Sequence, residues 1–160
     1  MHIAVCVKQI QDPEMPSALL RVDKGANKMR LASGVSPVMS PFDEQAIEAA
    51  LRIRDARDEV KIIVITLGEE NARQMLKAGL SLGADEGVLL SDPAYRDSDS
   101  YTTALALSRT IEKLGDVDLV LTGRQAADFD AGVVGCGIAE LLDIPAITFA
   151  RAVAVTDGSV

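Results

Sequence analysis

The chain has 160 residues, a formal net charge of −8 at neutral pH, and a composition that is 48% hydrophobic but only 3% aromatic. This length predicts one domain with a sizeable core, which must be built from Val, Ile, Leu and Ala, as in a parallel sheet covered by helices. An acidic chain with few aromatic side chains is a poor match for a nucleic-acid backbone, and no apolar run approaches the length of a membrane span.

The first third of the chain predicts a strand, a hairpin and a helix. Residues 3–7 form a continuous apolar run with β-branched side chains, which predicts a central strand. Residues 18–22 and 28–31 flank a turn-like segment and predict a small hairpin. The Ser-Pro-Phe-Asp tetrapeptide at 40–43 combines a good N-cap, a proline at the first helical position and an acidic residue at the capping-box position. From this local pattern we interpret it as a helix start and nothing more.

The remaining chain alternates apolar strand patterns with amphipathic helix patterns. Strands are expected at 60–67, 87–90, 119–121 and 146–149, and helices at 69–82, from a cap at Ser98 or Asp99 to Leu114, and up to residue 142. Four strand–helix units predict an α/β fold with a doubly wound, five-stranded, mainly parallel sheet, right-handed crossovers and helices on both faces.

The predicted strand order brings three segments together. With the first strand central and the 119–121 strand beside it, the loops after these two strands meet at the carboxyl edge of the sheet. The helix start at residue 40 faces the same crevice. Sheets of this kind bind ligands at such an edge, where the strand order reverses.

A glycine-containing loop joins the 119–121 strand to the next helix. Gly132 and Gly135 lie near the predicted helix start, where free backbone N–H groups and the helix dipole favour an anion. Glycine there lets the backbone approach a phosphate. Asp128 and Asp130 repel an anion unless their carboxylates turn to other donors, and Arg124 either offsets them or pairs with a partner's carboxylate. An ordinary connection, with small residues for tight packing, explains the same pattern equally well.

The reactive side chains do not form a catalytic set. Cys6 and Cys136 are far apart and in no metal or redox spacing, so we expect them to be small packing groups in a reducing compartment. His2 is the only histidine, which argues against a His-based triad or metal site. The N-terminal apolar run is too short for a signal peptide, so we expect a cytoplasmic protein.

The last residues predict an unfinished hairpin. Residues 152–156 have a strand pattern, Asp157-Gly158 is a strong hairpin turn, and only two residues follow it. We therefore expect residues 1–160 to be a single domain that forms the N-terminal part of a longer chain.

Five segments resemble the β subunit of electron-transfer flavoproteins. They are the first strand at 4–10, the helix start at 40–50, the Gly-Ala-Asp turn at 79–85, the Leu-Val-Leu-Thr-Gly-Arg-Gln-Ala-Ala-Asp run within 118–130, and the helix at 137–142. They occur in the family's order over nearly the whole chain. The resemblance implies one nucleotide-binding domain with an adenine nucleotide hydrolase-like fold.

The resemblance also implies an electron-carrier subunit rather than an enzyme. In the family, the β subunit buries AMP, or a second FAD in the electron-bifurcating branch, and pairs with an α subunit that holds most of the FAD contacts. The flavin passes electrons from dehydrogenases to a quinone oxidoreductase or another acceptor. By matching position, the nucleotide contacts fall on Cys6, Ser40, Pro41, Phe42, Asp43, Leu67, Gly123, Arg124, Gln125, Ala126, Ala127, Asp128, Phe129, Asp130, Ala131, Gly132, Val133 and Val134.

These positions imply particular roles. The backbone N–H groups of residues 130–134 would hold phosphate, and Asp128 would accept from ribose hydroxyls or order the loop. Backbone near Cys6 and Leu67 would read the adenine edge.

The chain departs from the family pattern at three of these positions. Ser40 replaces the usual Asn as one cap for another, Val133 replaces a Gln that would hydrogen-bond the nucleotide, and Phe129 is bulkier than the usual residue. The alternative is a stand-alone adenine-nucleotide-binding domain of the universal-stress-protein type. A homodimer that copurifies with ATP would favour this alternative. A nucleotide hydrolase ranks last, because the sequence offers no convincing nucleophile or metal site.

Overall fold

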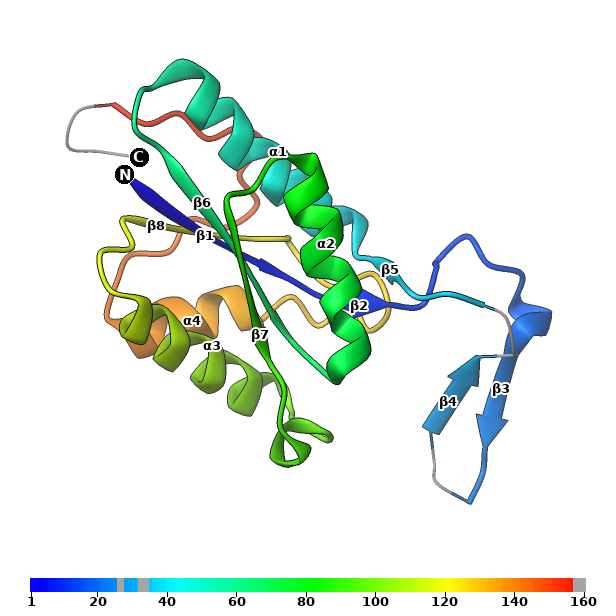
Figure 1. Ribbon diagram of the computed structural model, residues 1–160. Helices are drawn as coiled ribbons and strands as arrows, with labels where there is room; N and C mark the ends of the chain where they lie inside the picture. Colours follow the sequence, from blue (N-terminus) through cyan, green and yellow to red (C-terminus); the bar gives the residue numbers. More distant parts are fainter. Residues whose placement is uncertain (26–27, 32–34, 157–160) are drawn as a thin grey trace.

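A four-stranded parallel sheet lies at the centre of the computed structural model, which describes residues 1–25, 28–31 and 35–156 (Figure 1). Its strand order is β7-β6-β1-β8, from Glu86–Leu90, Lys61–Leu67, His2–Val7 and Leu119–Thr122. The first strand is therefore central and lies beside β8, as predicted. Cys6 of β1 is in register with Ile65 of β6 and with Thr122 of β8.

Helices cover both faces of this sheet, which confirms the predicted α/β class. Helices α1 (Pro41–Ala56) and α2 (Arg73–Leu82) cover one face, and α3 (Ser100–Leu114) and α4 (Val134–Leu142) cover the other (Figure 1). Because successive side chains of a strand point to opposite faces, Ile3 and Val5 enter the first core while Ala4 and Cys6 enter the second. This two-sided burial explains why β1 is apolar at consecutive positions.

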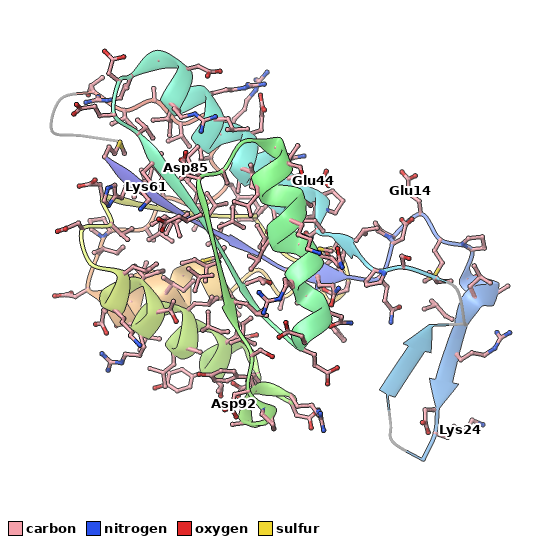
Figure 2. The ribbon with its side chains drawn as sticks, in the orientation of Figure 1. Glu14, Lys24, Glu44, Lys61, Asp85 and Asp92 are labelled. Atoms are coloured by element: carbon pink, nitrogen blue, oxygen red, sulfur yellow. The ribbon has the colours of Figure 1, made fainter. Side chains whose placement is uncertain are left out.

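The connection between β1 and α1 carries two small antiparallel pairs. β3 (Leu20–Asp23) pairs with β4 (Lys28–Leu31), which confirms the predicted hairpin, and a 3₁₀ turn (Ser17–Leu19) precedes it. Figure 2 shows that the hairpin projects from the domain, with Lys24 at its far end. β2 (Gln9–Ile10) pairs with β5 (Val38–Met39) at its base. The sequence did not predict this second pair, because two residues are too few to show a period.

The helix boundaries agree with the sequence pattern to within a few residues. At the start of α3, Asp99 accepts a hydrogen bond from the backbone N–H of Thr102 at 2.7 Å, which makes it the N-cap. The helix expected at 69–82 is α2 preceded by a 3₁₀ turn (Glu70–Ala72), and another 3₁₀ turn (Pro93–Tyr95) follows β7.

The predicted strand at 146–149 is wrong. These residues are irregular, and Ile147 and Phe149 are 74% and 77% exposed. Phe149 has a φ of 55°, which a β-strand does not allow. A short apolar run becomes a strand only when a neighbour accepts its backbone hydrogen bonds, and no described strand lies beside it. Residues 152–156 likewise form no strand, only a single bridge at Thr156, and Asp157-Gly158 falls outside the described residues.

Candidate functional site

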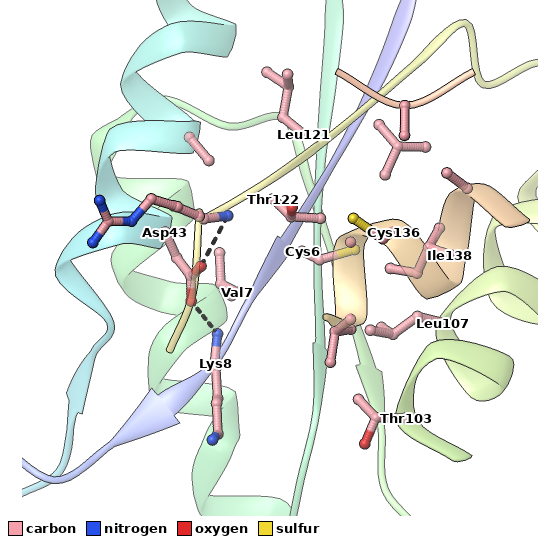
Figure 3. A pocket seen from close by; sticks show the side chains of 18 of the residues that line it. Cys6, Val7, Lys8, Asp43, Thr103, Leu107, Leu121, Thr122, Cys136 and Ile138 are labelled. Atoms are coloured by element: carbon pink, nitrogen blue, oxygen red, sulfur yellow. Dashed lines mark hydrogen bonds between the residues drawn. The ribbon is translucent and has the colours of Figure 1, made fainter. Parts of the chain in front are cut away.

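Strands β1, β6 and β8 end at one edge of the sheet, where α1 also begins. A cleft opens there, and Figure 3 shows part of its lining. The cleft has a volume of about 2010 Å³, and residues 144–154 also line it. Thirteen of the predicted contact residues line it: Cys6, Phe42, Asp43, Leu67, Gly123, Arg124, Gln125, Ala126, Phe129, Ala131, Gly132, Val133 and Val134. Ser40, Pro41, Ala127, Asp128 and Asp130 do not line it. The tertiary structure thus brings the predicted segments together, although not every side chain faces the cleft.

Asp43 joins the three segments that meet at this edge. Its Oδ2 accepts the backbone N–H of Lys8, just after β1, at 2.8 Å. Its Oδ1 accepts the backbone N–H of Gly123, just after β8, at 3.2 Å. A Cβ at Gly123 would overlap Asp43 Oδ1 and lie 2.9 Å from the carbonyl carbon of Phe42. Gly123 is therefore needed for the close approach of the loop to α1.

The local interpretation of the helix start at residue 40 is incomplete. Ser40 occupies the N-cap position and its carbonyl accepts the N–H of Asp43 at 2.9 Å, but its side chain makes no capping bond. Its Oγ is buried without a hydrogen-bond partner among the described residues. The capping box is not formed either, because Asp43 serves the two loops instead of the helix start, and the N–H of Ser40 donates to the carbonyl of Lys8 at 3.0 Å.

Burial controls the protonation of the two titratable groups at the base of the cleft. Desolvation raises the pKa of Asp43 to about 7, against the opposing effect of the two backbone donors and the Lys8 charge. Desolvation, with the nearby Asp43 carboxylate, raises the pKa of the Cys6 thiol to about 12. Cys6 is therefore protonated at neutral pH and is not a nucleophile.

The loop of residues 123–133 is held mainly by polar side chains. Lys8 Nζ donates to both carboxylate oxygens of Asp128 at 2.8 Å. Gln125 Nε2 donates to Asp130 Oδ1 at 2.6 Å. The two acidic side chains of the loop thus have donors of their own, which is the arrangement that an anion site requires.

The start of α4 offers unpaired backbone donors. Along the chain, the first N–H group of α4 that donates to a backbone carbonyl is that of Gly137, which donates to the carbonyl of Val133 at 2.9 Å. Within the described residues, the N–H groups of residues 131–136 have no acceptor. The expectation that the N–H of Asp130 also holds phosphate is corrected, because this group donates to the carbonyl of Ala126 at 2.9 Å. The unpaired N–H groups and the helix dipole favour a negative charge at this point of the cleft.

The glycines of this region have different structural causes. Gly132 has a φ of 63°, so it is needed for its backbone conformation, and a Cβ there would meet only ordinary contacts. At Gly135, a Cβ would lie 2.6 Å from Thr122 Oγ1, and at Gly137 it would lie 2.9 Å from the Cβ of Ala104. The expectation that Gly135 clears space for an anion is therefore corrected, because this glycine allows α4 to pack on β8.

All three phenylalanines of the chain lie at this edge, each beside a cation. The guanidinium carbon of Arg124 is 5.0 Å from the ring centre of Phe42 and 5.5 Å from that of Phe149. Lys8 Nζ is 5.3 Å from the ring centre of Phe129, which is 81% exposed. Arg124 thus uses its charge on aromatic faces, an arrangement that the sequence did not reveal.

Lys8 is the residue that sequence reasoning missed. It follows a strand directly, and a basic residue at the carboxyl edge is a signal that could have marked it.

The described residues contain no group of three or more His, Cys, Asp or Glu side chains able to hold a metal ion. Within the same residues, no helix has the length and apolarity needed to cross a membrane.

Comparison with known proteins identifies the family. The family model described as the electron transfer flavoprotein domain matches residues 16–160. The chain belongs to the electron transfer flavoprotein family. It is 40% identical over 161 residues to the electron transfer flavoprotein subunit beta of Megasphaera elsdenii, which covers 97% of this chain and 58% of that protein.

Two further relatives of the flavoprotein family cover the chain to the same extent. The caffeyl-CoA reductase–Etf complex subunit CarD of Acetobacterium woodii is 39% identical over 157 residues, covering 98% of this chain and 58% of CarD. Protein FixA of Sinorhizobium fredii is 38% identical over 161 residues, covering 98% of this chain and 54% of FixA. The chain thus spans little more than half the length of these relatives.

Proposed function

We propose that this chain is the nucleotide-binding part of an electron-transfer flavoprotein β subunit and holds AMP, or a second FAD, in the cleft. It pairs with an α subunit that carries most of the FAD contacts. The flavin of the pair passes electrons from dehydrogenases to a quinone oxidoreductase or another acceptor. In this role the chain is an electron-carrier subunit rather than an enzyme, in line with relatives that are named as subunits of electron transfer flavoproteins.

One observation carries the proposal. The unpaired backbone N–H groups at the start of α4 lie at the carboxyl edge of the sheet, beside a loop whose carboxylates already have donors. Backbone N–H groups at a helix start are a recurrent phosphate site, and their dipole supports the charge without any basic side chain. In support, the cleft also includes Cys6 and Leu67 at the ends of β1 and β6, where an adenine edge can be read by backbone groups.

The residues present fit an adenine nucleotide. Such a nucleotide supplies a phosphate, ribose hydroxyls and a flat base to the site, and FAD supplies redox chemistry in addition. Residues 131–134 offer N–H donors for the phosphate, and of the loop's two left-handed residues, Asp130 and Gly132, only Gly132 has no side chain. The exposed Val133 contributes no polar group where the family commonly has Gln. We infer that binding rests on backbone donors.

Mass spectrometry of the nucleotide released on denaturation tests the proposal directly, and AMP titration calorimetry completes it. Val133→Gln and Val133→Glu form a matched pair that differs only in charge at the helix start. We expect the Gln variant to bind AMP at least as tightly as the parent and the Glu variant to bind about tenfold more weakly. Absence of a released nucleotide, together with no AMP binding at millimolar concentration, would overturn the proposal.

A further inference from the structure

The middle of the 123–133 loop depends on one distant side chain. Within the described residues, only two side chains from outside this loop hydrogen-bond to it. Asp43 holds the N–H of Gly123, at the beginning of the loop. Lys8 holds the carboxylate of Asp128, in its middle. The middle of the loop is therefore tied to the rest of the domain mainly through Lys8.

Lys8 is itself held firmly at its backbone. Its N–H donates to Asp43 Oδ2 at 2.8 Å, and its carbonyl accepts the N–H of Ser40 at 3.0 Å. Both bonds tie the residue to the start of α1, next to the end of β1. Figure 3 shows the Lys8 side chain extending from this point away from Asp43. The ammonium group is thus placed by a rigid support, although the side chain is 46% exposed.

The contact between Lys8 and Asp128 is more specific than an ordinary surface ion pair. Both carboxylate oxygens lie 2.8 Å from Nζ, and the Asp128 side chain is only 21% exposed. Asp128 Oδ1 also accepts the N–H of Phe129 at 3.0 Å, and the ring of Phe129 lies beside the same ammonium. Three interactions therefore converge on Lys8, whereas an isolated exposed pair stabilises a protein very little.

The charge of Lys8 also matters for an anion in the cleft. The loop carries two carboxylates, Asp128 and Asp130, and Gln125 gives Asp130 a neutral donor only. Without Lys8, the ionised Asp128 would repel a phosphate bound at the start of α4. In a half-buried site this repulsion is weakly screened.

We propose that Lys8 is a positioning residue of the nucleotide site, which fixes the phosphate-binding loop through Asp128 and cancels the charge of that carboxylate. This inference rests on the proposed function for its ligand, but its effect on the loop is independent of any ligand. Lys8 acts through Asp128 and is not assigned a contact with the phosphate.

The test compares Lys8→Met, which keeps the aliphatic stem, with Lys61→Met as a matched control. Lys61 forms an ion pair with Glu86 at 2.7 Å, at the start of β6 and thus at the opposite edge of the sheet (Figure 2). Amide hydrogen exchange of residues 125–130 is measured on the nucleotide-free 160-residue proteins. We expect several-fold faster exchange in Lys8→Met and parent-like exchange in Lys61→Met. Parent-like exchange in Lys8→Met would overturn the inference.

AMP titration then separates positioning from direct contact. Lys8→Met is expected to weaken AMP binding about tenfold, and Lys61→Met to leave it unchanged. In an Asp128→Asn background the Lys8→Met change should cost much less, because the charge that Lys8 cancels is already gone. An equal loss in both backgrounds would overturn the route through Asp128. If the parent binds no AMP, the proposed function fails, while hydrogen exchange still decides the role of Lys8.

Discussion

Replacing Asp43 by Asn should destabilise the protein at acidic pH, whereas at alkaline pH the variant should be as stable as the parent or more stable. In the folded protein the pKa of Asp43 is raised from 3.8 to about 7, because burial disfavours the charged carboxylate. That difference corresponds to about 4 kcal/mol between the two protonation states. The groups that face it are Lys8, Gly123 N–H, Asp128 and Cys6.

The sign follows from proton binding. Between pH 3.8 and about 7 the folded state keeps a proton that the unfolded state has released. The free energy of unfolding contributed by Asp43 is therefore complete below pH 3.8 and falls as pH rises through about 7. Asn does not titrate, but its carbonyl can serve only one of the two backbone N–H groups, which costs about 1–3 kcal/mol at every pH.

The two contributions predict a crossover. At pH 4, where the parent has lost only about 0.6 kcal/mol of its protonation advantage, Asp43→Asn should be less stable than the parent. At pH 8 the parent bears the cost of the buried charge, and the variant should be equal to it or more stable by about 1–3 kcal/mol. Urea unfolding of both proteins at pH 4, 5, 6, 7 and 8 measures this difference.

Asp99 provides a control of opposite sign. Backbone and side-chain hydrogen bonds from Thr102 lower the pKa of this exposed N-cap carboxylate. The stability that Asp99 contributes is therefore present at neutral pH and lost as pH falls through the lowered pKa. Relative to the parent, Asp99→Asn should become less stable as pH rises, which is the opposite of the trend expected for Asp43→Asn. A stability difference between Asp43→Asn and the parent that is the same at pH 4 and pH 8 would refute the reasoning.

The glycines and cysteines give three further predictions. Gly135→Ala should destabilise the protein by about 1–3 kcal/mol in thermal unfolding, because its Cβ would meet Thr122 Oγ1. Adding Thr122→Ala should recover much of the lost stability, and no recovery would contradict the packing assignment. Gly132→Ala should cost about 1–2 kcal/mol because φ is positive there, and Gly132→Asn should cost less; equal stability of parent and Ala variant would contradict this. A thiol reagent at pH 8 should modify the exposed Cys136 in the native protein and reach Cys6 only after unfolding, so two reactive thiols in the native state would disprove the burial argument.

The sequence predicted those parts of the fold that depend on local pattern and strand order. β1 is recognisable because a strand buried on both faces must be apolar at consecutive positions. The start of α3 is recognisable because Asp99 caps its own helix through a bond to Thr102, three residues away. Alternation of strands and helices then restricted the topology, so the neighbourhood of β1 and β8 followed without any tertiary information.

The predicted strand at 146–149 marks the limit of that reasoning. Its apolar residues satisfy the strand pattern, but a strand requires hydrogen-bond partners from another segment, and pattern alone does not supply them. In the structure the segment is irregular, with Phe149 in a left-handed conformation and its ring beside Arg124. The meeting of the segments that form the candidate site was predictable, since strand order alone brings the loops after β1 and β8 to one edge.

What only the tertiary structure decided is which partner each polar side chain takes. Asp43 has a local option, the helix start, and a distant one, the N–H groups of Lys8 and Gly123, and it takes the distant one. The reason is that the N–H of Ser40, which a capping box would serve, already donates to the carbonyl of Lys8 at 3.0 Å, whereas the N–H groups of Lys8 and Gly123 would lose their acceptor without Asp43. The same competition gives Lys8 its contact with Asp128, 120 residues away in the sequence. Local pattern was enough for the helices and the four strands of the central sheet, whereas burial after folding determined the contacts of the candidate site.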